Sequence, residues 1–341
     1  VQGAIVADCL FRHTGGAITT GRDAVVRRNT VIDDAAIAIA PGSGSLVDEN
    51  LVIRNFRDML QTRNGYQATA ITYFGQELIR FRNNVVLESP GNGFWPDCPS
   101  NGHVHYGNSV GYCKGNGFYI ECPAFMNIVL NNVCFHNGNG IYLRQNSHNT
   151  VSENYVIGGG SGVVLGCTES IHFNMRNNLI AGNWFRDVRV GISAGGGPAG
   201  RRQDLNLSDR NVFDPGIPTV AYWDGKPYKT LEEFRQGTGN EPHGRVEKIN
   251  EQELGLVSFR VAESSRPWER CLMFGNPTVQ RADWGFITDY PYFWHFGTLE
   301  QWDHVRWYTH PGLSVPLGHA DPDCGGFVRN SMEGQYLVSA S

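Results

Sequence analysis

A seven-residue motif repeats in the middle of the chain and constrains its fold more than any other feature. Its four copies read Gly-Asn-Gly-Phe-Trp-Pro-Asp (91–97), Gly-Asn-Gly-Phe-Tyr-Ile-Glu (115–121), Gly-Asn-Gly-Ile-Tyr-Leu-Arg (138–144) and Gly-Ser-Gly-Val-Val-Leu-Gly (160–166). Successive copies begin 24, 23 and 22 residues apart. A step this constant indicates a stacked architecture in which each copy occupies the same place in its unit.

A second repeat runs in phase with the first. It is an asparagine followed two residues later by Val or Leu, found at Asn29, Asn50, Asn83, Asn108, Asn131, Asn154 and Asn177, with Asp8 in the same place at the start. Short β-branched runs separate these turns, and helical periodicity is absent. Units of about 22 residues with three short strands predict an all-β, right-handed parallel β-helix of about eight visible coils. The asparagines should form a ladder from coil to coil.

The sequence predicts three segments. The β-helix should span 1–194, a Gly-rich break with a last irregular coil should follow over 195–215, and residues 216–341 should form a C-terminal cap or buttress. The stretch Thr230-Leu-Glu-Glu233 is a capping box and predicts a short helix near 230–237.

Two further features concern the ends and the insertions of the β-helix. A tryptophan-rich stretch from Trp268 to Trp307 is expected to cover the open end of the helix, although a sugar-binding role for it stays open. The coil between Asn50 and Asn83 is too long and predicts a protruding loop. Because the chain starts at Val1 with the repeats already under way, we expect the β-helix to continue from a missing N-terminal part.

Composition excludes several classes of partner. The net charge of −5 and the absence of a basic stripe argue against nucleic acid, and no apolar run is long enough for a membrane span. Eight cysteines occur without CxxC or zinc-type spacing, and Cys98, Cys122 and Cys167 follow the variable position of their repeats. We expect free thiols, which slightly favours a cytoplasmic over a secreted protein.

Alternation along each repeated strand predicts which side chains point outward. The inward residues should be Phe94, Phe118, Ile141 and Val163, and the outward residues should be Trp95, Tyr119, Tyr142 and Val164. The last motif position shares the outward face and presents, coil by coil, Asp97, Glu121, Arg144 and Gly166. Aromatic faces beside charged hydrogen-bonding groups are suited to holding a sugar.

Asp97 and Glu121 should lie one coil apart, with Cα atoms roughly 5 Å from each other by strand spacing. That separation favours the two-carboxylate mechanism of a retaining glycosidase over that of an inverting one. Arg144 would hold a substrate hydroxyl or keep a carboxylate ionised. The competing interpretation is a solvated charge ladder at an exposed corner, which contributes little to stability.

A β-helix with Asp on one coil and Glu on the next resembles the retaining β-xylosidases of glycoside hydrolase family 120. The resemblance covers about residues 83–166 and rests on architecture and spacing, and other β-helix glycosidases, fucosidase-like ones included, stay open as alternatives. It implies Asp97 as nucleophile, Glu121 as acid/base, no cofactor or metal, and a small plant-type oligosaccharide as substrate.

Substrate contacts are expected from a set of outward or flanking residues: Trp95, Tyr119, Tyr142, Arg144, His103 and His105. For the two histidines a polar role in a turn is the competing interpretation. Two other functions stay open, namely a polysaccharide lyase with a Ca²⁺-binding carboxylate ladder and an Arg base, and a non-catalytic glycan-binding β-helix. Homo-oligomerisation is also left open.

Overall fold

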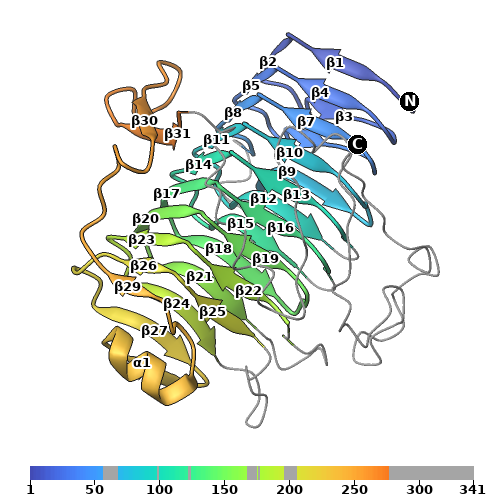
Figure 1. Cartoon of the computed structure of the whole chain (residues 1–341). Helices are drawn as coiled ribbons and strands as arrows, with labels where there is room; N and C mark the ends of the chain where they lie inside the picture. The colour runs from blue at the N-terminus through green and yellow to red at the C-terminus, as the bar shows by residue number, and fades with distance from the viewer. Residues whose placement is uncertain are drawn as a thin grey trace, which may run out of the picture.

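The computed structural model describes residues 1–56, 68–97, 100–121, 124–166, 175, 177–195 and 206–275. Within these residues the chain forms a right-handed parallel β-helix, as the sequence predicts, with coils stacked from the N-terminus towards a short helix at the other end (Figure 1). Three long sheets run along its length, and each strand pairs with the equivalent strand one coil away.

The first sheet, sheet A, consists of nine three-residue strands. They are β1 (Ile5–Ala7), β4 (Val25–Arg27), β7 (Leu46–Asp48), β10 (Arg80–Arg82), β13 (Val104–Tyr106), β16 (Ile128–Leu130), β19 (Thr150–Ser152), β22 (Leu179–Ala181) and β25 (Leu207–Asp209). The middle residue of these strands points inward, as shown by Val26, Val47 and Phe81, all 0% exposed.

The second sheet, sheet B, has ten strands. They are β2 (Leu10–Arg12), β5 (Thr30–Ile32), β8 (Leu51–Ile53), β11 (Val85–Leu87), β14 (Ser109–Gly111), β17 (Val133–Asn137), β20 (Tyr155–Gly159), β23 (Trp184–Arg186), β26 (Val212–Phe213) and β29 (Arg245–Val246). A single turn residue with positive φ, such as Glu49 or Asn83, redirects the chain from sheet A into this sheet.

The third sheet, sheet C, contains the repeated motif and has the longest strands. They are β3 (Ile18–Thr19), β6 (Ile39–Ala40), β9 (Thr69–Phe74), β12 (Asn92–Asp97), β15 (Asn116–Ile120), β18 (Asn139–Arg144), β21 (Ser161–Gly166), β24 (Val190–Gly195), β27 (Thr219–Trp223) and the antiparallel β28 (Lys226–Tyr228). The residues predicted to point inward, Phe94, Phe118, Ile141 and Val163, are all 0% exposed, which confirms the predicted alternation.

Close approach between coils explains the second glycine of the motif. A Cβ on Gly93, Gly117 or Gly140 would lie 2.7, 2.7 and 2.5 Å from a glycine carbonyl oxygen of the next coil. Contacts this short with backbone cannot be relieved by moving a side chain. The motif therefore permits the coils to stack at this corner.

A buried asparagine ladder runs along the turn between sheets A and B. Each Nδ2 donates to the Oδ1 one coil further, at 2.9–3.0 Å, along Asn29, Asn50, Asn84, Asn108, Asn132, Asn154, Asn183 and Asn211. The same Oδ1 atoms also accept from the backbone amides of the preceding rungs, for example from Asn84. The ladder thus satisfies polar groups that the interior would otherwise leave unpaired.

The ladder prediction was right for Asn29, Asn50, Asn108 and Asn154 and wrong for three others. Asn83 and Asn131 each precede a rung, and their φ values of 51° and 53° show that they make the left-handed turn instead. Asn177 precedes Asn178, which belongs to a second ladder, Asn127, Asn149, Asn178 and Asn206, between sheets C and A. Asp8 precedes Cys9, whose amide donates to the first rung.

The β-helix continues beyond residue 194, through the segment 195–215 in which the sequence predicted a glycine-rich break and a last irregular coil. Strands β25, β26 and β27 extend all three sheets by another coil after the glycine-rich segment. The break in sequence periodicity at that segment therefore does not end the stack, because strand register resumes on its far side. Strand β29 then pairs with β26 and adds a further rung to sheet B.

Helix α1 (Leu231–Thr238) covers the last coil. Thr230 and Glu233 form the predicted capping box, and Gly239 ends the helix with a φ of 76°. Phe234 packs on Trp223 and Tyr228 with ring centroids 5.5 Å apart in both cases. In the described part of the chain, no helix is long and apolar enough to cross a lipid bilayer.

A hairpin of β30 (Leu256–Phe259) and β31 (Cys271–Phe274) lies beside sheet B (Figure 1). Its Leu272 and Phe274 belong to a second apolar cluster with Phe135 and Tyr155 of the β-helix. The C-terminal region therefore supports the side of the stack as well as its end. Most of the predicted tryptophan-rich stretch, and the loop predicted in the long coil, fall outside the described residues.

Cysteines in the described part are all free thiols, at Cys9, Cys113, Cys134 and Cys271. Cys98, Cys122 and Cys167, which were expected to stack, fall outside the described residues.

Replacing a ladder rung should destabilise the fold strongly. Asn132→Ala removes the Oδ1 atom that accepts from Asn108 Nδ2. It also removes the Nδ2 atom that donates to the backbone carbonyls of His105 and Leu130, and all of these hydrogen bonds are buried. We expect the free energy of unfolding to fall by about 3 kcal/mol or more, since several buried groups lose partners. Asn131→Gly is the control, because glycine keeps the left-handed turn of the neighbouring residue. Urea denaturation measures both, and equal losses would contradict the ladder assignment.

Glu241 makes stability depend on pH. Its carboxylate is 0% exposed and accepts hydrogen bonds from Ser208 and Asn211, and burial raises its pKa to about 7. The folded state therefore holds the proton more tightly than the unfolded chain, so the contribution of Glu241 to stability is greatest at low pH and is lost between about pH 4.5 and pH 7. The difference between these two pKa values corresponds to a loss of about 3 kcal/mol.

Glu241→Gln should remove this dependence of the unfolding free energy on pH, whether the substitution raises or lowers stability at any one pH. Denaturation of both proteins between pH 4.5 and pH 8 measures it, and parallel curves would show that Glu241 is not responsible.

Candidate functional site

The predicted row of charged residues forms at the C-terminal ends of three neighbouring strands of sheet C. Phe94 pairs with Phe118, and Tyr119 pairs with Tyr142, which brings β12, β15 and β18 into register. The Glu121 amide donates to the Pro96 carbonyl at 3.0 Å. Asp97, Glu121 and Arg144 thus follow one another coil by coil, as predicted.

Glu121 lies at the centre of a hydrogen-bonded network. Its Oε2 accepts from Trp95 Nε1 at 2.9 Å, and its Oε1 pairs with Arg144. The same Arg144 nitrogen donates to the Tyr119 hydroxyl at 2.8 Å. The Glu121 side chain is 13% exposed and that of Arg144 26%. The carboxylate is therefore held in one orientation by an aromatic N–H and a guanidinium.

The electrostatics of Glu121 balance opposing effects. Burial raises the pKa of this carboxyl, Arg144 lowers it, and the negative charge of Asp97 raises it. The net shift is upward, so the protonated form persists to higher pH than in an ordinary glutamate. Burial also raises the pKa of the Tyr119 hydroxyl, which stays neutral. A carboxyl with raised pKa beside a second carboxylate is the arrangement of an acid/base pair.

An aromatic row lies beside the charged one. Ring centroids are 5.9 Å apart between Trp95 and Tyr119, and 5.3 Å between Tyr119 and Tyr142. Trp95 and Tyr119 are only 8% and 2% exposed. They therefore enclose the hydrogen-bonded network around Glu121 and offer little open surface on which a sugar ring could stack. Tyr142 leans over Gly166, where a Cβ would lie 2.2 Å from the tyrosine hydroxyl. The glycine at the variable position thus makes room for this ring.

Sequence reasoning missed Phe74. This residue pairs with Asp97 one coil earlier, is 57% exposed, and its ring centroid lies 6.0 Å from that of Trp95. Its strand, β9, lacks the Gly-Asn-Gly signature, so the motif did not include it. Strand length and register would have found it. Phe74 therefore continues the row of Asp97, Glu121 and Arg144 by one coil and places an exposed aromatic ring beside Trp95.

His103 and His105 are not substrate ligands, contrary to the prediction. Both are 0% exposed, and the His105 ring stacks on Phe81 with centroids 4.7 Å apart. His103 Nδ1 accepts from the Ile79 amide, and His105 Nε2 meets the Tyr73 hydroxyl at 3.3 Å. Burial lowers the pKa of both rings, that of His103 to about 3. His105 occupies the inward position of β13, so the competing interpretation of a polar turn residue is also wrong for it.

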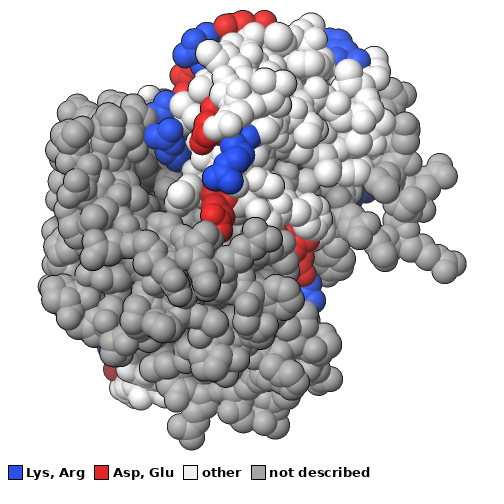
Figure 2. Space-filling view, turned by 90° about the vertical axis from the view of Figure 1, so that its right-hand side faces the viewer, with Lys and Arg blue, Asp and Glu red and all other residues white. Residues whose placement is uncertain are grey.

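Charges on the described surface are paired across coils. Asp8 pairs with Arg28 at 2.7 Å and Asp48 with Arg82 at 2.9 Å. On the described part of the face in Figure 2, acidic and basic side chains alternate in a line and form no patch of one sign. Among the residues described, no group of three or more His, Cys, Asp or Glu side chains is placed to hold a metal ion.

Removing Arg144 should raise the pKa of Glu121. The guanidinium is the main influence that lowers this pKa, so in Arg144→Gln burial and Asp97 are opposed only by the weaker hydrogen bonds from Tyr119 and Trp95. Carboxyl-carbon NMR of glutamate-labelled protein measures the titration. Arg186→Gln, at an ion pair elsewhere on the helix, is the control. An unchanged or lower Glu121 pKa in Arg144→Gln would contradict the network described.

Comparison with known proteins identifies the family and not an individual relative. The family model described as "Periplasmic copper-binding protein (NosD)" matches residues 2–197, which is 196 of the 341 residues. Neither the curated proteins nor the solved structures gave a match. The matched segment includes β1 to β24 and the whole charged row. The resemblance to glycoside hydrolase family 120 thus extends to the parallel β-helix and has no specific support beyond it. With more than half of its length matched, the chain belongs to the NosD family.

Proposed function

We propose that the chain is a retaining glycoside hydrolase acting on small oligosaccharides, with Asp97 as nucleophile and Glu121 as acid/base. One observation carries the proposal: two carboxylates lie in register on adjacent coils, and burial raises the pKa of one of them, Glu121. Adjacent strands bring their Cα atoms to about 5 Å. This separation suits direct attack by one carboxylate better than activation of an intervening water.

The two carboxylates take different parts in the reaction. Asp97 attacks the anomeric carbon and forms a glycosyl ester, while protonated Glu121 donates its proton to the departing glycosidic oxygen. Glu121 then removes a proton from water, which attacks the anomeric carbon and releases the sugar and Asp97. A raised Glu121 pKa supports the first step, since the acid must be protonated before it can donate.

Neighbouring side chains assist the exchange of roles. Once Glu121 has given up its proton, Trp95 Nε1 and Arg144 donate to its two oxygens and stabilise the carboxylate. The neutral Tyr119 hydroxyl accepts from Arg144 and fixes the guanidinium. Phe74, exposed at the edge of the row, offers an apolar face to a sugar ring.

The lyase alternative has less support. A Ca²⁺ site takes six to eight oxygen ligands, whereas both oxygens of Glu121 already accept from Trp95 and Arg144. Arg144 is also the only basic residue in the row of Asp97, Glu121, Arg144 and Gly166, whereas a polyanionic substrate favours a basic groove. A glycan-binding protein without catalysis is the remaining alternative, and the activity measurements below separate it from a hydrolase.

Copper does not fit the described residues, although the family description names it. The interior histidines His103 and His105 are both completely buried and engaged with Ile79 and Tyr73. Cys113 and Cys134 are buried, and burial raises the pKa of both thiols, which disfavours the metal-binding thiolate. No step of the proposed mechanism uses copper.

The family description also bears on location. A periplasmic location, taken from that description, agrees with the secreted alternative and not with the cytoplasmic one that the sequence slightly favoured.

Activity should depend on both carboxylates in different ways. On a panel of nitrophenyl glycosides, with β-xyloside tried first, Asp97→Asn should abolish turnover for every leaving group. Glu121→Gln should lose about 10²–10⁴-fold with a poor leaving group and much less with dinitrophenol, which departs without protonation. Asp187→Asn, an exposed carboxylate paired with Arg186, is the matched control.

Product stereochemistry provides an independent check. Proton NMR during hydrolysis should show the first-formed sugar with the anomeric configuration of the substrate. An inverted product, or normal turnover by Asp97→Asn, would refute the mechanism. An unsaturated product and loss of activity with a chelator would indicate the lyase, while glycan binding without turnover would indicate a binding protein.

A further inference from the structure

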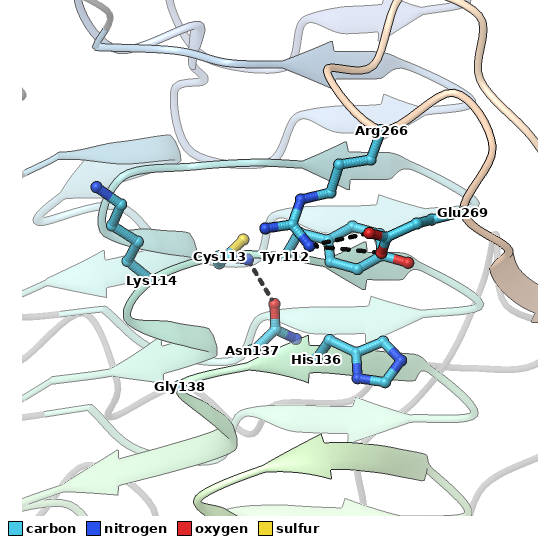
Figure 3. A pocket seen from close by; sticks show the side chains of 8 residues that line it. All are labelled: Tyr112, Cys113, Lys114, His136, Asn137, Gly138, Arg266 and Glu269. Atoms are coloured by element: carbon cyan, nitrogen blue, oxygen red, sulfur yellow. Dashed lines mark hydrogen bonds and ion pairs between the residues drawn. The ribbon is translucent and has the colours of Figure 1, made fainter.

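We propose that the chain has a second site, for a small organic anion, at the corner between sheets B and C. A cavity of about 440 Å³ lies there, between two β-helix turns, 112–114 and 136–138, and the C-terminal residues Arg266 and Glu269 (Figure 3). The two turns lead into the N-terminal ends of β15 and β18. Glu121 and Arg144 lie at the C-terminal ends of the same strands. The cavity is thus built from two parts of the chain that are far apart in sequence.

The C-terminal wall of the cavity is fixed to the β-helix. Ser264 Oγ, Ser265 Oγ and the Ser265 amide all donate to Glu88, and the Tyr112 hydroxyl donates to the Arg270 carbonyl at 3.2 Å. These bonds attach the segment on both sides of Arg266 to the β-helix, and so they fix the position of Arg266. The cavity wall therefore has a defined position.

Two cationic side chains border the cavity. The Arg266 guanidinium lies over the Tyr112 ring, 5.0 Å from its centroid, and Figure 3 shows it extended towards Cys113, with Lys114 on the other side. Lys114 is exposed, and within the described part of the chain no carboxylate pairs with it. The His136 ring stacks on Tyr112, with centroids 5.6 Å apart and planes 16° apart.

The local charge is positive in a chain that is negative overall. Among the residues that line the cavity, Lys114 and Arg266 contribute two positive charges and Glu269 one negative charge, which leaves +1. The whole chain carries −5. Glu88, beside the cavity, is engaged by Ser264, Ser265 and Arg54. An anion entering the cavity would therefore meet two cations and one carboxylate that already pairs with Arg266.

The size and lining define the class of ligand. A volume of about 440 Å³ lies in the range of small-molecule sites and accommodates a molecule of monosaccharide size. Arginine favours the planar geometry of carboxylate and phosphate, and lysine adds a point charge. The ligand class is therefore a small hydroxylated molecule with one carboxylate or phosphate group, such as a sugar acid or a sugar phosphate.

This site is separate from the proposed glycosidase site. Lys114 precedes strand β15 and Glu121 follows it, seven residues later, so their Cα atoms lie up to roughly 23 Å apart at the rise of an extended chain. A single monosaccharide cannot reach both. The inference therefore does not depend on the glycosidase proposal.

Calorimetric titration of the full chain at low ionic strength tests the site. The probes are galacturonate and glucose 6-phosphate, with galactose and glucose as neutral counterparts. We expect saturable binding of at least one anion and none of its neutral counterpart. Lys114→Gln and Arg266→Gln should each weaken that binding by about tenfold, the usual effect of one charge-assisted hydrogen bond.

Glu269→Gln should have the opposite effect and strengthen binding, because its carboxylate lies 3.2 Å from Arg266 and competes with the ligand. Lys229→Gln, an exposed lysine beside helix α1, is the matched control and should bind like the wild type. Should Arg266→Gln fail to fold, Lys114→Gln and Glu269→Gln suffice, since their predicted effects differ in sign.

Several results would overturn the site: no binding of either anion, equal binding of neutral sugars, or unchanged affinity in both Lys114→Gln and Glu269→Gln. Selective binding of one probe identifies the carboxylate or the phosphate as the recognised group and supports the proposal. Asp97→Asn should bind the anion normally even if it has lost hydrolysis, so the two proposals fail separately.

Discussion

The register of parallel strands between successive coils is the constraint on which the rest of the structure depends. One coil in sheet C advances the chain by 22 to 24 residues in the central copies of the motif and returns each side chain to its place in the row. The asparagine ladders maintain this register inside the turns, since each amide pairs with its equivalent one coil away. A slip of one residue would turn Phe94 and Phe118 outward and disperse the row of Asp97, Glu121 and Arg144.

The site uses the positions at which the repeat is free to vary. Glycine and apolar residues of the motif meet backbone or core and cannot change without a clash or a cavity. The last position is not held in this way, and there the chain places Asp97, Glu121 and Arg144 side by side. Stacking supplies the short separation between like charges that chemistry with two carboxylates requires.

The sequence was sufficient for the fold and for the charged row, because both follow from periodicity. It was insufficient where the deciding contact lies outside the repeat. Asn83 and Asn84 are equally plausible rungs in the sequence, and only backbone φ separates the turn residue from the rung. His105 was misplaced because polar residues suggest turns, whereas stacking on Phe81 makes its ring a core residue. The wall provided by Arg266 could not be predicted, since its position depends on the contacts of Glu88 with a segment more than 170 residues away.

The central proposal is that the register of sheet C places a nucleophile at Asp97 and an acid/base at Glu121. A 2-deoxy-2-fluoro glycoside with an activated leaving group tests it most directly. The fluorine slows both formation and breakdown of the glycosyl-enzyme, and the activated leaving group restores its formation, so the intermediate accumulates. Mass spectrometry of the intact chain and its peptides should then find one sugar esterified to Asp97. Attachment of the fluorosugar to Glu121 would contradict the account. So would a protein that hydrolyses the parent glycoside but never forms a covalent adduct with the fluorosugar.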